Sequence, residues 1–195
     1  IVLGIDRAGF VGEDGETHHG LFDVAMLTTV PGVTVYSPSD TAELSQCLEQ
    51  ALYKDKGIVA VRYPRGCELY RSGTKAYSDF RYVSNKNRKL IFTYGRISAY
   101  AYTIHGVDIL QAIKIFPIAD EIIDICLAYD EIYAFEEGER EGGIAQKLCT
   151  ALALAGFKGR FTITAVDGFV RHADVATQLH NAMLDADGMR KITGE

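Results

Sequence analysis

The sequence lacks several features that would place it in a specialised class. No apolar run approaches the ~20 residues that a membrane-spanning helix needs, and no segment has the layout of a signal peptide. Basic residues are not in excess, since 20 Lys and Arg stand against 26 Asp and Glu, for a net charge of −6. This balance argues against a membrane or nucleic-acid partner, although local basic side chains can still bind a phosphate group.

Cysteine is scarce and scattered. Cys47, Cys67, Cys126 and Cys149 form no CxxC pair and no Cys/His grouping at metal-ligand spacing. We interpret them as reduced, mostly buried thiols of a cytoplasmic protein. The rest of the composition, 195 residues with 48% hydrophobic and 24% charged side chains, is that of an ordinary globular chain. The sequence also begins without methionine, inside an apolar run at Ile1, so we expect it to be cut or part of a longer chain.

Short apolar runs alternate with helix-periodic stretches, and this order predicts an α/β fold. In the first part of the chain we expect strands at 1–6, 33–38 and 57–65, and helices at 20–27 and 40–52. Pro38 ends the second strand, and Asp40 with Glu43 fits an acidic capping box. Because the strands are apolar throughout, they predict open, mostly parallel sheets with helices on both faces.

The same alternation restarts after a polar stretch. We expect strands at 89–95, 109–116, 131–137 and 160–167, and helices at 97–104, 119–130, 144–157 and roughly 174–184. The polar residues 67–88 are interpreted as a linker that can hold a small edge hairpin. The chain then divides into units 1–66 and 89–195. Since about 60 residues bury only a marginal core, the first unit is interpreted as the back half of a domain whose front half is missing.

Residues 12–20, GEDGETHHG, follow the first predicted strand and carry most of the chemistry of this region. They lie at the carboxyl edge of the sheet, where open α/β sheets bind ligands, and Arg7 comes directly off the strand end. Three interpretations stay open: a solvated polar turn, a substrate loop or a metal site. The stretch lacks the EF-hand pattern, and the adjacent His18 and His19 are poorly placed to share one metal ion.

The motif RYPRG places Arg62 and Arg65 at the end of the third predicted strand, on the same sheet edge. A guanidinium there can bind a phosphate or carboxylate, or it can pair with a neighbouring acid on the surface. The loop at 136–143, EEGEREGG, has neither GxGxxG spacing nor the lysine of a P-loop, so a structural turn is favoured. His172 precedes the last helix and is interpreted as a cap or interface residue.

These motifs occur in a recognisable order. The segments DRAGFVGEDGETHHGLFDVAML, PGVTVYSPSD and AVRYPRG resemble the latter part of the pyrimidine-binding domain of the 1-deoxy-D-xylulose-5-phosphate synthase family. This family consists of thiamine-diphosphate enzymes of the transketolase superfamily. The later segments IFTYG, FEEGEREGG and GFVRHAD are similar to its transketolase C-terminal domain. Transketolases share a GEDG-TH loop but usually lack DRAG and YPRG, so the synthase family is the better match.

The resemblance implies an activity and roles for single residues. Such an enzyme decarboxylates pyruvate on its cofactor and adds the two-carbon unit to glyceraldehyde 3-phosphate, making 1-deoxy-D-xylulose 5-phosphate for isoprenoid and thiamine precursors. By this resemblance Arg7 and Arg65 hold the acceptor's phosphate, and Asp14 orients its hydroxyl group. His18 hydrogen-bonds the substrate or moves a proton near the cofactor. His19 is the weaker candidate, because the family often has glutamine there. A substrate loop is therefore favoured for residues 12–20.

The resemblance also implies groups that this sequence lacks. The family holds Mg²⁺ and the cofactor's diphosphate on an N-terminal domain with a GDG…N motif, and the activating glutamate is expected upstream of Ile1. We therefore assign no cofactor-binding residue and no metal ligand here. We expect a homodimer with the missing cofactor domain in the same or a partner chain, and an inactive fragment in its absence. The alternatives are the C-terminal subunit of a split transketolase and a non-catalytic, partner-binding relative.

Overall fold

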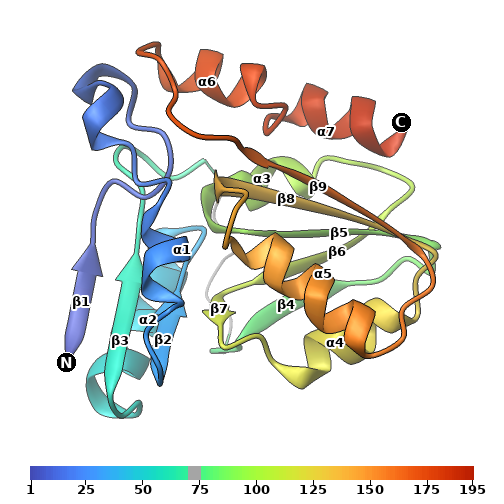
Figure 1. Ribbon diagram of the computed structural model, residues 1–195, viewed down its shortest axis with the longest axis horizontal. Coiled ribbons are helices and arrows are strands. Elements are labelled where there is room, and N and C mark those ends of the chain that lie inside the picture. The colour runs from blue at the N-terminus through green and yellow to red at the C-terminus, as the bar shows by residue number, and fades with distance from the viewer. Residues whose placement is uncertain (70–75) are drawn as a thin grey trace.

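A computed structural model describes residues 1–69 and 76–195, and its strands form two sheets (Figure 1). The first sheet has the order β1-β3-β2-β7. Its members are β1 (Val2–Ile5), β3 (Ile58–Arg62), β2 (Val33–Tyr36) and β7 (Lys114–Phe116). The first three run parallel, and β7 is antiparallel to β2. A segment from the second half of the sequence thus completes the sheet of the first half.

The second sheet has the order β4-β6-β5-β8-β9. Its members are β4 (Phe80–Val83), β6 (Asp108–Ala112), β5 (Lys89–Tyr94), β8 (Glu131–Glu139) and β9 (Arg160–Val166). All neighbouring pairs are parallel except β4, which is antiparallel to β6 at the edge. The predicted fold class, two open and mostly parallel sheets with helices on both faces, is confirmed.

Helices cover both faces of each sheet. They are α1 (Asp23–Leu27), α2 (Thr41–Tyr53), α3 (Ser98–Ala101), α4 (Asp120–Leu127), α5 (Ile144–Leu154), α6 (Val175–Asn181) and α7 (Ala186–Thr193). In Figure 1, α6 and α7 lie on one side of the second sheet, and α4 and α5 lie on the other. No helix among the described residues is long and apolar enough to cross a membrane.

One hydrophobic core belongs to both sheets. Val35 and Ala60 of the first sheet lie in the same buried cluster as Phe92, Leu110 and Ile132 of the second. A second cluster packs α3, α6 and α7 against the opposite face of the second sheet, and it includes Phe10 and Leu21, which flank the GEDGETHHG stretch. The segment after β1 is therefore anchored in the core of the second sheet, and this anchoring positions the candidate site.

The start of α2 follows the sequence expectation closely. The Asp40 side chain accepts a hydrogen bond from the Glu43 amide at 2.8 Å, which caps the helix as predicted. The Glu43 carboxylate reaches back one residue further than in a capping box and accepts from the Ser39 amide at 3.0 Å. It also accepts from the Gln111 side chain of β6, so the helix start is tied to the second sheet.

Three predicted elements differ from the structure. The single strand expected at 109–116 is wrong: it splits into β6 and β7, which belong to different sheets. At the break, the Ile113 carbonyl accepts from the Ser37 amide at 2.8 Å, and its own amide donates to Asp79. An apolar run reports burial but not which sheet buries it, so periodicity does not show this crossover.

The other two differences lie in the linker and at the C-terminus. Residues 67–88 contain an edge strand, β4, paired with the distant β6 instead of a local hairpin partner, and residues 70–75 of this predicted linker fall outside the described part of the chain. The last helix ends at Asn181, and a further helix, α7, starts at the N-cap Asp185. Gly188 in the first turn of α7 weakens its helical pattern in the sequence.

Candidate functional site

The opening loop, residues 7–20, leaves β1 and closes on itself at a narrow neck. The Gly9 amide donates to the Gly20 carbonyl at 2.8 Å, and the Gly20 amide donates back to Gly9 at 2.9 Å. Gly9 has a φ of +79°, a conformation that favours glycine. At Gly20 a Cβ would lie 2.3 Å from the Arg7 carbonyl oxygen, so a side chain there is excluded. The DRAG and THHG glycines thus make the neck possible.

Asp14 lies between the two candidate phosphate-binding arginines. Its Oδ2 accepts from Arg7 Nε at 2.9 Å, and its Oδ1 accepts from Arg65 Nη1 at 2.6 Å. The hydrogen bond from Arg7 and the nearby charge of Arg65 hold the pKa of Asp14 below its usual value, although desolvation opposes them. The same hydrogen bond raises the pKa of Arg7. Residues from two separate loops thus converge on one carboxylate at the sheet edge.

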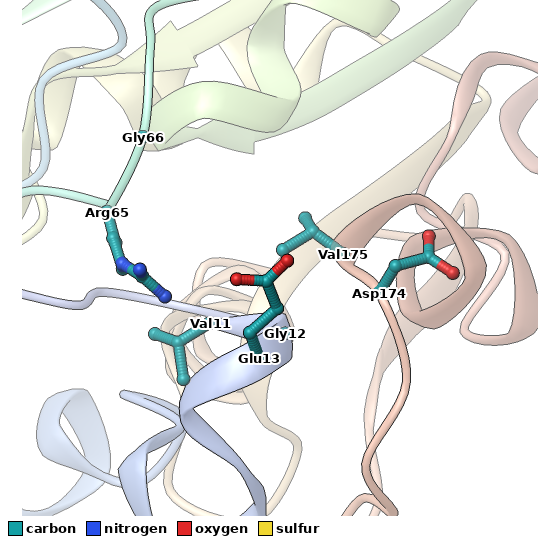
Figure 2. A pocket seen from close by; sticks show the side chains of 7 residues that line it. All are labelled: Val11, Gly12, Glu13, Arg65, Gly66, Asp174 and Val175. Carbon is teal, nitrogen blue, oxygen red and sulfur yellow. The ribbon is translucent and has the colours of Figure 1, made fainter.

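A cavity of about 270 Å³ opens beside this cluster (Figure 2). Its lining residues are Val11, Gly12, Glu13, Arg65, Gly66, Asp174 and Val175. Figure 2 shows Arg65 and Glu13 pointing toward each other from separate loops, while Asp174 turns toward α6. Asp174 caps that helix by accepting from the Thr177 amide at 2.9 Å. The volume suits a small metabolite, since drug-sized ligands occupy cavities of about 300 Å³ and more.

The two adjacent histidines have different surroundings. His18 is exposed, and its Nδ1 lies 3.1 Å from the Thr17 hydroxyl. His19 is buried, accepts from the Val11 amide at 3.1 Å and stacks edge-to-face on Phe10 with ring centroids 5.7 Å apart. Burial lowers the pKa of His19. His18 is therefore the histidine that a ligand can reach, whereas His19 lies in the interior of the loop.

Arg62 is buried and has a structural role, whereas Arg65 does not. Its Nε donates to Asp23 Oδ2 at 2.9 Å and its Nη2 to Asp23 Oδ1 at 3.1 Å, a two-pronged contact with the start of α1. The same Nη2 donates to the Gly20 carbonyl at 3.0 Å. Arg62 thus stabilises the neck of the opening loop, and the geometry leaves Arg65 as the arginine of RYPRG that faces the cavity.

The EEGEREGG segment contains two buried carboxylates with defined partners. Glu136 accepts from the Ile144 and Ala145 amides at 2.9 and 2.8 Å, so it caps the N-terminus of α5. Burial raises the pKa of Glu136. Glu137 forms a buried ion pair with Arg96. Sequence reasoning missed Arg96 and Glu137; the available signal was a pair of acids at the end of an otherwise apolar strand, because buried acids need partners.

The remaining candidates are placed as follows. His172 is exposed, and its backbone amide donates to Glu16 Oε1 at 3.3 Å, so the segment before α6 contacts the opening loop. Within residues 1–69 and 76–195, no group of three or more His, Cys, Asp or Glu side chains is arranged to hold a metal ion.

The chain is similar to proteins of one superfamily. A family model described as transketolase, pyrimidine binding domain matches residues 1–68. A 1-deoxy-D-xylulose-5-phosphate synthase of Thermus thermophilus is 32% identical over 200 residues, covering 98% of this chain and 32% of that enzyme. The synthase of Chlorobium luteolum is 33% identical over 213 residues, covering 100% of this chain and 33% of that enzyme. The chain thus spans about a third of the length of these curated relatives.

A solved structure gives the same result for the fold. A split gene transketolase in an inactive beta4 tetramer superposes with a TM-score of 0.80 at 17% identity, over 96% of this chain and 63% of that one. At this identity the solved structure shows the fold alone. The sequence matches are those expected of a fragment of the transketolase superfamily. Relatives with at least 30% identity over nearly the whole chain include several 1-deoxy-D-xylulose-5-phosphate synthases, which confirms the resemblance found in the motifs.

Proposed function

We propose that this chain is the acceptor-binding part of a thiamine-diphosphate-dependent 1-deoxy-D-xylulose-5-phosphate synthase. The whole enzyme would condense pyruvate, with loss of CO₂, and glyceraldehyde 3-phosphate. The observation that carries the proposal is the cluster of Arg7, Asp14 and Arg65 beside a small cavity. Arg65 lines this metabolite-sized cavity, and Arg7 shares the Asp14 carboxylate with it. Guanidinium groups so placed suit an acceptor that ends in a phosphate group.

Each member of the cluster has a separate task in this proposal. Arg7 and Arg65 bind the acceptor's phosphate through charge-assisted hydrogen bonds, using the several N–H groups that each guanidinium presents. Asp14 holds both arginines next to each other and, as an ionised acceptor, orients a hydroxyl group of the substrate. His18, exposed on the same loop, donates a hydrogen bond to the substrate or exchanges a proton with it.

The described residues, 1–69 and 76–195, offer no set of ligands for the cofactor's metal. No metal-binding group of acids, histidines or cysteines occurs in the described ranges, and we assign no residue to the cofactor's diphosphate. We therefore derive no catalytic step through thiamine diphosphate or Mg²⁺. In the proposal both are held by a further domain, in the same or a partner chain of a cytoplasmic homodimer. Residues 1–66 and 89–195 are then two domains joined by 67–88, and they are inactive without the cofactor domain.

A second candidate is a separate C-terminal subunit of a split transketolase. One observation fits it without favouring it over the synthase: a structural neighbour is a split gene transketolase, and its 17% identity supports only the fold. The two candidates predict different gene sequences upstream of the codon for Ile1. A reading frame that continues upstream of Ile1 into a GDG-containing domain supports the synthase, and a start codon near Ile1 supports the subunit.

The direct test compares arginine variants in the full-length enzyme encoded with this chain. Arg65→Ala should raise the KM for glyceraldehyde 3-phosphate about 10- to 150-fold, because it removes a charge-assisted contact of roughly 1.5–3 kcal/mol. The matched control is Arg88→Ala, since Arg88 is exposed and pairs with Asp130 far along the chain from the cluster. An unchanged KM in the Arg65 variant would remove this residue from the site.

A second measurement tests the proposed dependence on the cofactor domain. Residues 1–195 alone, supplied with pyruvate, glyceraldehyde 3-phosphate, thiamine diphosphate and Mg²⁺, should give no product. Thiamine-dependent product formed by this chain alone would contradict the proposal.

A further inference from the structure

Two buried charged residues of the second sheet, Arg96 and Glu137, contact the opening loop that follows β1 of the first sheet. Arg96 lies in the turn Gly95–Ile97 directly after β5, and Glu137 lies within β8. Arg96 Nε donates to Glu137 Oε2 at 3.0 Å, and each side chain is only 7% exposed. Burying a charge pair is costly unless the remaining hydrogen-bonding positions are also used. The partners of those positions therefore indicate what the pair does.

Further hydrogen bonds of Arg96 and Glu137 go to the backbone of one loop residue, Phe10. Glu137 Oε1 accepts from the Phe10 amide at 2.8 Å, and Arg96 Nη2 donates to the Phe10 carbonyl at 2.7 Å. Phe10 itself is fully buried in the core that packs α6 and α7. The ion pair thus holds both backbone groups of Phe10, which is four residues before Asp14 in the sequence.

The loop is shaped to admit the carboxylate. A Cβ built on Gly9 would lie 2.3 Å from both Cδ and Oε1 of Glu137. Only a residue without a side chain allows this approach, and Gly9 also needs its φ of +79°. The glycine of the DRAG motif is therefore explained by the contact with Glu137 as well as by the turn.

Two buried arginines hold the two ends of the loop. Arg96 binds the carbonyl of Phe10, and Arg62 binds the carbonyl of Gly20 at 3.0 Å. Between these two anchors lies Asp14, which contacts Arg65. We propose that Arg96 and Glu137 are positioning residues that couple the second sheet to the opening loop and hold Asp14 and Arg7 in register with Arg65. The coupling follows from the contacts alone, and its relevance to an acceptor rests on the proposed function.

The coupling can be tested on this chain without any activity. Amide hydrogen exchange of peptides covering 9–20 should rise at least about tenfold in Glu137→Ala, because the loop loses its anchor and opens locally. Glu137→Gln, which keeps an acceptor for the Phe10 amide but loses the charge, should give a smaller rise. Glu131→Ala is the control: Glu131 lies at the other end of β8 and pairs with Arg160, so exchange in 9–20 should not change.

The outcomes separate a positioning role from a purely structural one. If exchange rises equally throughout the chain in Glu137→Ala, the variant has lost its fold and Glu137→Gln decides. Unchanged exchange of 9–20 in Glu137→Gln then overturns the coupling. If exchange rises only in the opening loop, the coupling is supported.

The role toward an acceptor is tested in the full-length enzyme. Glu137→Gln should raise the KM for the phosphorylated aldehyde about tenfold while kcat and the KM for pyruvate stay within about twofold. Parallel losses in kcat and both KM values would indicate a general structural effect and overturn the positioning role. If Arg65→Ala raises the aldehyde KM and Glu137→Gln does not, the positioning role fails while the proposed function stands. If neither variant changes it, the proposed function fails.

Discussion

Substitution of Gly9 by alanine tests the packing at the neck of the opening loop. The change puts a Cβ 2.3 Å from the Glu137 carboxylate and forces a side chain onto a φ of +79°. The backbone strain costs about 1–2 kcal/mol. Displacing the carboxylate from Phe10 and Arg96 breaks a buried ion pair, a loss of about 3–5 kcal/mol. The free energy of unfolding should therefore fall by roughly 4–7 kcal/mol, a large part of the ~5–15 kcal/mol that a typical fold has.

Gly32→Ala is the matched control. Gly32 has a φ of +75°, but nothing lies within 4 Å of a Cβ built there, so only the strain of about 1–2 kcal/mol remains. Urea unfolding of both variants, followed by circular dichroism, measures the difference. The contact between Glu137 and the loop would be refuted if the two alanine variants lost stability to within about 1 kcal/mol of each other.

Three further predictions concern single side chains. Glu13→Gln should bind inorganic phosphate about two- to fivefold more tightly by calorimetry, because it removes a negative charge from the cavity, and the gain should shrink with added salt. His19→Gln should flatten the pH dependence of the free energy of unfolding. Because burial lowers the pKa of His19 in the folded state, protonation of this residue favours the unfolded chain. The wild type should therefore lose stability relative to the variant as the pH falls below about 6.5. In thiol labelling followed by mass spectrometry, the exposed Cys67 should react well before the buried Cys47 and Cys126. Desolvation also raises the pKa of Cys126 to about 12, which slows its reaction further. Equal labelling rates would contradict the burial pattern.

Much of the fold could be read from the sequence because its strands and helices have regular periods. The N-cap at Asp40 and the strands β1, β3 and β5 lie where the apolar pattern and turn residues place them. The crossover at Ile113 could not be predicted, since one continuous apolar run serves two sheets there. Its position depends on contacts with Ser37 and Asp79, which are distant in sequence.

The convergence of the candidate site residues could be predicted from the sequence because of the geometry of parallel sheets. Arg7 and Arg65 follow neighbouring parallel strands, whose carboxyl ends meet at one edge, and the structure brings both onto Asp14. Arg96 and Glu137 lie 41 residues apart and contact Phe10, which is 86 residues from Arg96 and 127 from Glu137. The two acids at the end of an apolar strand indicate that buried partners exist, but a single sequence does not show which residues these are, because such long-range side-chain contacts have no period.

The central claim is that the arginine cluster recognises a phosphate group on the acceptor. The most direct measurement compares kcat/KM for glyceraldehyde 3-phosphate and for unphosphorylated glyceraldehyde in the full-length enzyme and in its Arg65→Ala variant. We predict a strong preference for the phosphorylated aldehyde in the wild type, and a preference about 10- to 150-fold smaller in the variant, as the loss of one charge-assisted contact requires. An equal preference in both enzymes would contradict the assignment of Arg65 and of the cavity beside it.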